Sequence, residues 1–286
     1  MKQRGMTVVE LIVVLAIMSI VTGALYSTFV NQQSSYTRQS QIQNIQESAQ
    51  TGIVILKRDI MMAGYGVDKS LALYIKDGGS TGPDEIYIND ASFIDESDLL
   101  DSIYGETGFT GSGTSNITVD TLDIDSDGTN DFQGGVWQCI ITDNGTNKAA
   151  KINSISGNQL SLNSSVSGSY VAPAIYYCVD SEELKRSDRS SGGRQPIISN
   201  IVDLQVAYKD TNGNWYCDGT GSCPMSPFNP EDISLVRITL ISRIEKKTGR
   251  HLLSRPISAE NGPTWGNDKY RYRAYSVSVC PRNLRF

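Results

Sequence analysis

Three residues near the amino terminus of this 286-residue chain have types and spacing that could carry out chemistry. Gly5 and Met6 precede Glu10, and residues 11–30 then contain no charged side chain. Twenty uncharged, mostly apolar residues are enough to cross a bilayer as a helix. A carboxylate at the start of such a run is costly and needs a partner. We expect the partner of Glu10 to be supplied by another subunit.

The acidic segment 123–131 has the pattern of a calcium-binding loop. Oxygen-bearing side chains at alternate positions, followed by a glycine, let a loop curl round a hard cation. The expected ligands are the carboxylates and one carbonyl oxygen of Asp123, Asp125, Asp127, Asp131 and Thr129. Gly134 stands where a bidentate acid is usual, so this ligand set is incomplete. The alternative is a solvated acidic turn between two strands.

The element that positions Glu10 is a long helix. After the apolar run, hydrophobic residues recur at three- and four-residue steps and form one stripe on a polar helix. They are Ile42, Ile45, Ala49, Ile53, Leu56, Ile60 and Ala63. Gly64 is a natural stop for the helix. We therefore expect one helix from Met6 to Ala63, the first half in membrane or filament core and the second half packed on a globular domain.

The basic residues of the leader, Lys2 and Arg4, predict a cytoplasmic amino terminus, with the rest of the chain outside the membrane. An ordinary cleaved signal has a shorter apolar run, whereas a plain signal anchor fits the length and is the stronger alternative. We expect four segments. They are a leader (1–5), an apolar transmembrane or filament-core helix (6–30), its amphipathic continuation (31–66) and an extracytoplasmic β-rich domain (67–286).

Beyond residue 66 the sequence predicts mainly antiparallel strands separated by Gly, Ser, Asn and Asp, hence an α+β fold. Asn212-Gly213 is a strong hairpin signal. Segments 90–115 and 181–196 are predicted to be surface loops. The expected strands are 85–88, 117–124, 136–142, 151–155, 159–162, 174–179, 201–209, 215–217, 233–244 and 271–279.

All five cysteines lie in the part expected to be exported, where disulfides form readily. Cys217 and Cys223 are close in sequence and are predicted to bond to each other. Cys139 and Cys178 fall in strand-like segments and form the second predicted pair. Cys280 is left over, either buried and free or linked to a partner. One histidine and no Cys-x-x-Cys argue against zinc.

Gly5, Met6, Glu10 and the apolar helix resemble the type IV prepilins and type II secretion pseudopilins. The passage at 56–66 and the later stretches at 200–208, 235–240 and 281–284 resemble the PilW-type minor pilins and the related J-type pseudopilins. The resemblance implies that a prepilin peptidase cuts between Gly5 and Met6 and methylates the Met6 amine. That amine on one subunit would pair with Glu10 on its neighbour.

The resemblance implies a minor pilin that joins other minor pilins and the major pilin through its helix, in a tip or initiation complex. It would be a single-pass inner-membrane protein before assembly and lie at the pilus tip or cell surface afterwards. The alternatives are a pseudopilin of a type II secretion system, or an adhesion or DNA-binding ectodomain carried by a pilus. No catalytic motif is present, so we expect no enzyme and no required cofactor apart from the calcium candidate.

The net charge of −6 argues against nucleic-acid binding. One local stretch, 269–273, interleaves cations with aromatic residues in a way that could grip phosphates and stack on bases. An alternating strand with one solvated face accounts for the same pattern, and the acidic balance of the chain favours that interpretation.

Overall fold

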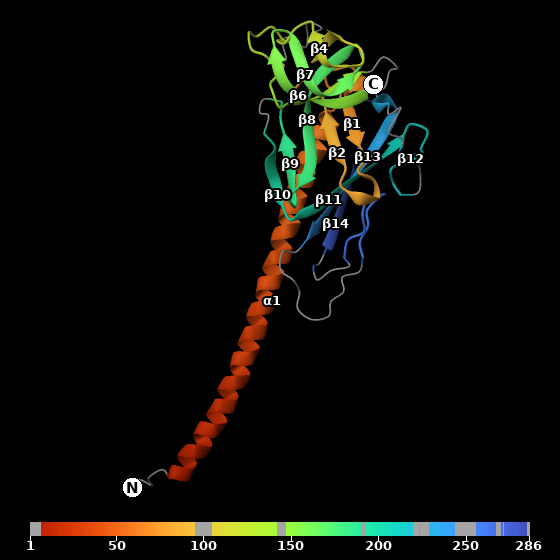
Figure 1. Cartoon of the computed structure of the whole chain (residues 1–286). Helices are drawn as coiled ribbons and strands as arrows, with labels where there is room; N and C mark the ends of the chain where they lie inside the picture. Colours follow the sequence, from red (N-terminus) through yellow and green to blue (C-terminus); the bar gives the residue numbers. More distant parts are fainter. Residues whose placement is uncertain are drawn as a thin grey trace. The chain divides into compact units, whose positions relative to one another are not determined.

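The computed structural model describes residues 7–94, 105–141, 147–189, 193–219, 223, 229–243, 256–266, 270 and 272–284, without the side chains of 138–141. This part forms one long α-helix, three 3-10 turns and fourteen strands (Figure 1). The chain divides into two compact units, residues 1–46 and 47–286. Helix α1 (Val8–Met62) runs through the boundary between them.

The first unit contains the amino-terminal part of α1. Its large apolar side chains are open to solvent, with Leu11 50% and Ile20 72% exposed. Within the described residues, α1 is the one helix long and apolar enough to span a membrane. Apolar surface of this extent is normally covered by lipid or by partner helices. The predicted apolar helix is confirmed.

The last turns of α1 belong to the second unit and supply part of its core. Ala49, Gly52, Leu56 and Ile60 are buried, at the three- and four-residue steps of one helix face. Ile42 and Ile45, the first members of the predicted stripe, are only partly buried. Apolar side chains from two β-sheets complete this core around the helix end, and the largest contributions come from β11 and β13.

One group of antiparallel strands is centred on β8 (Tyr170–Asp180), whose second half pairs with β2 on one edge and β9 on the other. The remaining strands of this group are β1 (Leu73–Lys76), β2 (Glu85–Ile88), β9 (Glu183–Ser187) and β10 (Gln195–Ser199). Short 3-10 turns, η1 (Lys69–Leu71) and η2 (Gly79–Thr81), flank β1.

The first half of β8 belongs to a ring of six strands, in the order β8-β3-β4-β7-β6-β5 and back to β8. Ring closure leaves these strands no open edges of the kind that invite pairing with other chains. A second apolar cluster collects side chains from the ring. Besides β8, the strands of the ring are β3 (Thr107–Thr110), β4 (Thr114–Val119), β5 (Trp137–Ile141), β6 (Asn147–Ser156) and β7 (Gln159–Val166), at the top of Figure 1.

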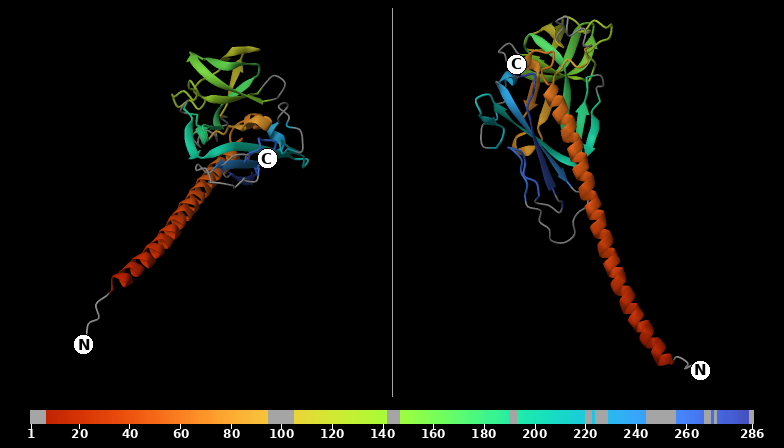
Figure 2. Two further views of the ribbon diagram at one scale, coloured as in Figure 1. Left: turned by 60° about the horizontal axis from the view of Figure 1, so that its bottom comes forward. Right: turned by 180° about the vertical axis from the view of Figure 1, so that it is seen from behind.

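A separate four-stranded antiparallel sheet follows the order β12-β11-β13-β14. Turn η3 (Pro230–Asp232) leads into β13. Figure 2 shows this sheet, coloured teal to blue, from two further directions. Its strands are β11 (Ile201–Asp210), β12 (Trp215–Tyr216), β13 (Ile233–Arg243) and β14 (Tyr272–Val279).

The α+β fold with antiparallel strands is confirmed, and so is the hairpin at Asn212-Gly213, where Tyr208 pairs with Tyr216. Two expectations were wrong. The strand predicted at 117–124 ends at Val119, because the acidic residues that follow form a loop. The segments 90–115 and 181–196, predicted as loops, contain β3, β9 and the start of β4 and of β10. These strands are polar, so alternation of apolar residues could not reveal them.

Candidate functional site

Glu10 lies in the first turn of α1, and its side chain is held by Thr7. Oε2 of Glu10 accepts hydrogen bonds from the Thr7 backbone N–H at 2.9 Å and from the Thr7 hydroxyl at 3.0 Å. The Glu10 N–H donates in return to Oγ1 of Thr7 at 3.3 Å. This reciprocal arrangement is a capping box, which satisfies N–H groups that lack a partner in the first turn. The Thr-x-x-Glu spacing before an apolar run was the signal for it in the sequence.

The capping box gives Glu10 a neutral partner within its own chain. No basic side chain of the described residues lies within ion-pair distance of it. The predicted processing residues, Gly5 and Met6, lie outside the described residues. A counter-charge from a neighbouring subunit therefore stays a prediction for Glu10.

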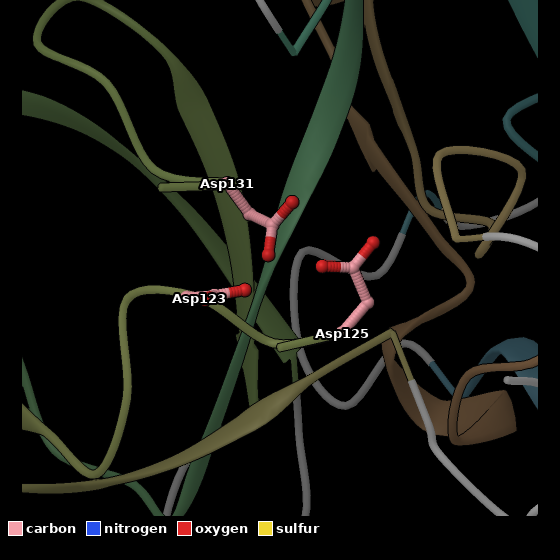
Figure 3. Close-up of side chains that lie close together, drawn as sticks. All are labelled: Asp123, Asp125 and Asp131. Carbon is pink, nitrogen blue, oxygen red and sulfur yellow. The ribbon is translucent and has the colours of Figure 1, made fainter. Parts of the chain in front are cut away.

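Three of the four predicted acidic ligands converge in the loop that follows β4. One carboxylate oxygen from each of Asp123, Asp125 and Asp131 lies within 4.8 Å of the other two, and the side chains face a common space (Figure 3). Backbone N–H groups hold all three in place, and the N–H of Asp127 donates to Oδ1 of Asp125 at 3.2 Å. Ile124 donates to Oδ2 of Asp131 at 2.6 Å, and Gly128 donates to Oδ2 of Asp123 at 2.9 Å.

Asp127 is not part of this cluster. Its carboxylate accepts hydrogen bonds from both the backbone N–H, at 2.6 Å, and the hydroxyl of Thr129. These bonds lower the pKa of Asp127. The structure therefore separates Asp127 from the other three acids, although the spacing alone made all four equivalent.

The converging carboxylates lie in an environment that disfavours their negative charge. Burial raises the pKa of Asp131 to about 6, and the neighbouring Asp125 and Asp123 charges add to the shift. Burial likewise raises the pKa of Asp125. Like charges held close together in a partly desolvated loop repel, and a bound cation would remove that repulsion.

The disulfide between Cys217 and Cys223 is present, with Cα atoms 4.4 Å apart, as predicted. The predicted Cys139–Cys178 pair is wrong, because Cys178 is a buried free thiol. In the register of β5 and β8, residue 139 pairs with Ala172, six residues from Cys178. Six residues along a strand span about 20 Å, far beyond disulfide reach. Cys280 is also free, and its thiol donates to the carbonyl of Ser234 at 3.0 Å.

Comparison with known proteins supports the amino-terminal features. The prokaryotic N-terminal methylation motif matches residues 1–26. No curated protein matches the sequence. Among solved structures, a type IV-like pilin from Thermus thermophilus is similar at 12% identity and a TM-score of 0.40, over 84% of this chain and 96% of that chain. That likeness is too distant to carry an argument about function.

The methylation motif leads directly into a long helix whose first part is exposed and apolar enough to span a membrane. The amino-terminal segment accordingly carries the type IV prepilin signal, followed by the apolar helix.

Proposed function

We propose that this chain is a minor pilin of a type IV pilus. In this proposal prepilin peptidase cuts between Gly5 and Met6 and methylates Met6. The mature subunit leaves the inner membrane and joins other minor pilins and the major pilin in a tip or initiation complex. The chain has a structural role, and catalysis is no part of it. Before assembly the amino terminus is cytoplasmic and the globular domain periplasmic.

One observation carries the proposal. Glu10 stands five residues after the methylation-motif glycine, at the start of a helix whose next twenty residues are uncharged and exposed. Such a helix needs lipid or other helices to cover it, and Glu10 needs a cation once water is excluded. A free amine at Met6 of an adjacent subunit supplies that cation, so each charge offsets the desolvation of the other.

The size of the globular part supports a place at the tip. The compact unit that begins at residue 47 holds all fourteen described strands, including the six-stranded ring. Bulk of this kind would hinder repeated packing along a filament shaft, whereas a terminal position leaves room for it.

The experiment separates inter-subunit charge pairing from helix capping. Glu10→Gln keeps a residue that a capping box accepts but removes the charge. Thr7→Val keeps the charge but breaks the box, at a cost of about 1 kcal/mol. We expect Glu10→Gln and Glu10→Ala to be cleaved after Gly5 yet to co-purify poorly with partner pilins. Thr7→Val should retain most co-purification.

Wild-type assembly of Glu10→Gln would refute the charge-pairing role. Mass spectrometry of each mature amino terminus confirms that processing at Gly5 is intact and that Met6 is methylated. A chain that still begins at Met1 would refute the proposal as a whole.

The alternatives are outcomes of two further assays. Loss of exported protein without loss of pili in a deletion strain would instead assign the chain to type II secretion. Salt-sensitive DNA binding would favour a ligand-binding ectodomain. Of the two arginines central to the basic stretch 269–273, Arg273 is exposed on β14 and Arg271 lies outside the described residues.

A further inference from the structure

We propose that Asp123, Asp125 and Asp131 bind one calcium ion, which fastens the loop between β4 and β5 to the six-stranded ring. The proposal concerns the globular domain alone and does not depend on assembly of the chain into a filament.

Two observations besides the clustering of acids point to a ligand. Oδ1 of Asp123 is shielded from solvent and has no hydrogen-bond partner among the described residues. Asp125 is only 9% exposed, and its carboxylate, whose Oδ1 accepts a hydrogen bond from the Asp127 N–H at 3.2 Å, faces the same space (Figure 3). A buried acceptor oxygen without a donor is costly, so native proteins usually supply a partner for it.

No basic side chain in the described part of the chain supplies that partner. None of the ion pairs formed by the described residues includes Asp123, Asp125 or Asp131. The three side chains bring formal negative charge to one small space in which no cation of the described residues lies. A metal ion bound between them would neutralise that charge.

The spacing of the oxygens suits calcium. Ca2+ binds oxygen at about 2.4 Å, so two oxygens on opposite sides of the ion are up to about 5 Å apart. The three carboxylate oxygens lie within 4.8 Å of one another and can therefore share one ion with small adjustments. Mg2+ demands shorter bonds of about 2.1 Å and stricter octahedral geometry, and fits this loop less well.

The ion would stabilise the packing of the loop, because each end of the loop places an apolar side chain in the second apolar cluster, the one that collects side chains from the ring. Ile124, between Asp123 and Asp125, is 8% exposed, and Phe132, next to Asp131, is 1% exposed. Repulsion between the carboxylates pushes these two anchors apart. A shared cation draws the acids together and so holds both anchors in the cluster.

The test uses the full-length chain in detergent, stripped of metal with EDTA and titrated with CaCl2 in a calorimeter. We expect one saturable site with a dissociation constant of about 0.1–1 mM, the range of extracellular calcium modules. Asp125→Asn and Asp131→Asn should each weaken binding about tenfold or more, because affinity depends on ligand charge. MgCl2 should bind at least several-fold more weakly than CaCl2.

Asp127→Asn is the matched control. It removes the same charge from the same loop, but the Asp127 carboxylate is bound to Thr129 and not to the cluster. Its calcium affinity should stay within about threefold of wild type, since only a more distant charge is lost. A loss as large as that of Asp125→Asn would overturn the proposed ligand set.

Thermal unfolding shows whether the variants fold. Calcium should raise the melting temperature of the wild-type chain and leave that of Asp125→Asn unchanged. In EDTA the Asp125→Asn chain should melt no lower than wild type, since one repelling charge is gone. Absence of saturable calcium binding to folded wild-type chain up to several millimolar would overturn the proposal.

Discussion

The hydroxyl of Tyr177 in β8 donates a hydrogen bond of 2.6 Å to Oδ2 of Asp59 in the last turns of α1. The same oxygen accepts from Nε of Arg186 in β9 at 3.0 Å. Asp59 is 4% exposed and Tyr177 is fully buried. A helix residue is thus joined to two strands more than one hundred residues away in sequence, which fixes the end of the helix to the sheet.

The first prediction concerns this contact. Asp59→Ala leaves a buried hydroxyl and a guanidinium without their acceptor and should cost roughly 2–4 kcal/mol of unfolding free energy. Arg58→Ala is the control, because Arg58 contacts the other oxygen of Asp59 at 3.2 Å but its side chain is 72% exposed. It should cost less than about 1 kcal/mol. Equal losses in denaturant unfolding would contradict the assignment.

The second prediction concerns pH. The buried carboxylate of Asp84 accepts hydrogen bonds from the N–H groups of Gly78 and Val206, but burial raises its pKa to about 7. An unfolded aspartate ionises near pH 4. Between about pH 4 and pH 7, Asp84 is therefore protonated in the folded chain and ionised in the unfolded chain. Stability from this group therefore falls as pH rises from about 4 to 7.

Asp84→Asn removes the titration, and the difference in unfolding free energy between pH 5 and pH 8 should shrink. The substitution also replaces one acceptor oxygen by a donor, so absolute stability falls at pH 5. The diagnostic quantity is the slope of the unfolding free energy against pH, measured in EDTA so that metal binding does not contribute. An unchanged slope would show that Asp84 is not the group responsible.

The third prediction compares two glycines of α1. A Cβ on Gly52 would lie 1.7 Å from Cδ1 of Ile198. Gly52→Ala should therefore lower the stability of the globular unit by about 1–3 kcal/mol through overpacking, despite the better helix propensity of alanine. Gly23→Ala meets no atom within 4 Å and should not destabilise the chain. A melting temperature for Gly52→Ala at or above wild type would contradict the close packing.

The fourth prediction concerns the cysteines. Peptide mapping of the non-reduced chain should recover Cys217 linked to Cys223. The buried thiol of Cys178 should be alkylated only after denaturation, whereas the partly exposed thiol of Cys280 should react in the folded chain. Reduction of this short loop should cost about 2–3 kcal/mol. Recovery of a linked Cys139–Cys178 peptide would require a different register between β5 and β8.

Local patterns in the sequence were enough to predict several features of the structure. The uncharged run at 11–30, the stripe through Leu56 and Ile60, the hairpin at Asn212-Gly213 and the Cys217–Cys223 loop all involve neighbours within a few turns or residues. Spacing alone determines such contacts, because the chain cannot place residues so close in sequence far apart in space.

The polar strands, the ring and the choice among the four acids of the loop depended on distant partners. Strand β9 is polar, yet Arg186 is positioned by Asp59 from the helix. The ring closes because β8 pairs with β3 and β5, which come tens of residues earlier.

The sequence by itself determined the apolar helix, its acidic start and the α+β class of this protein, since these follow from local periodicity and charge. Only the tertiary structure decided which strands pair with β8, which cysteines remain free and which carboxylates of the acidic loop lie close together. Those outcomes depend on register between segments far apart in the chain, where a shift of one residue turns every side chain to the opposite face.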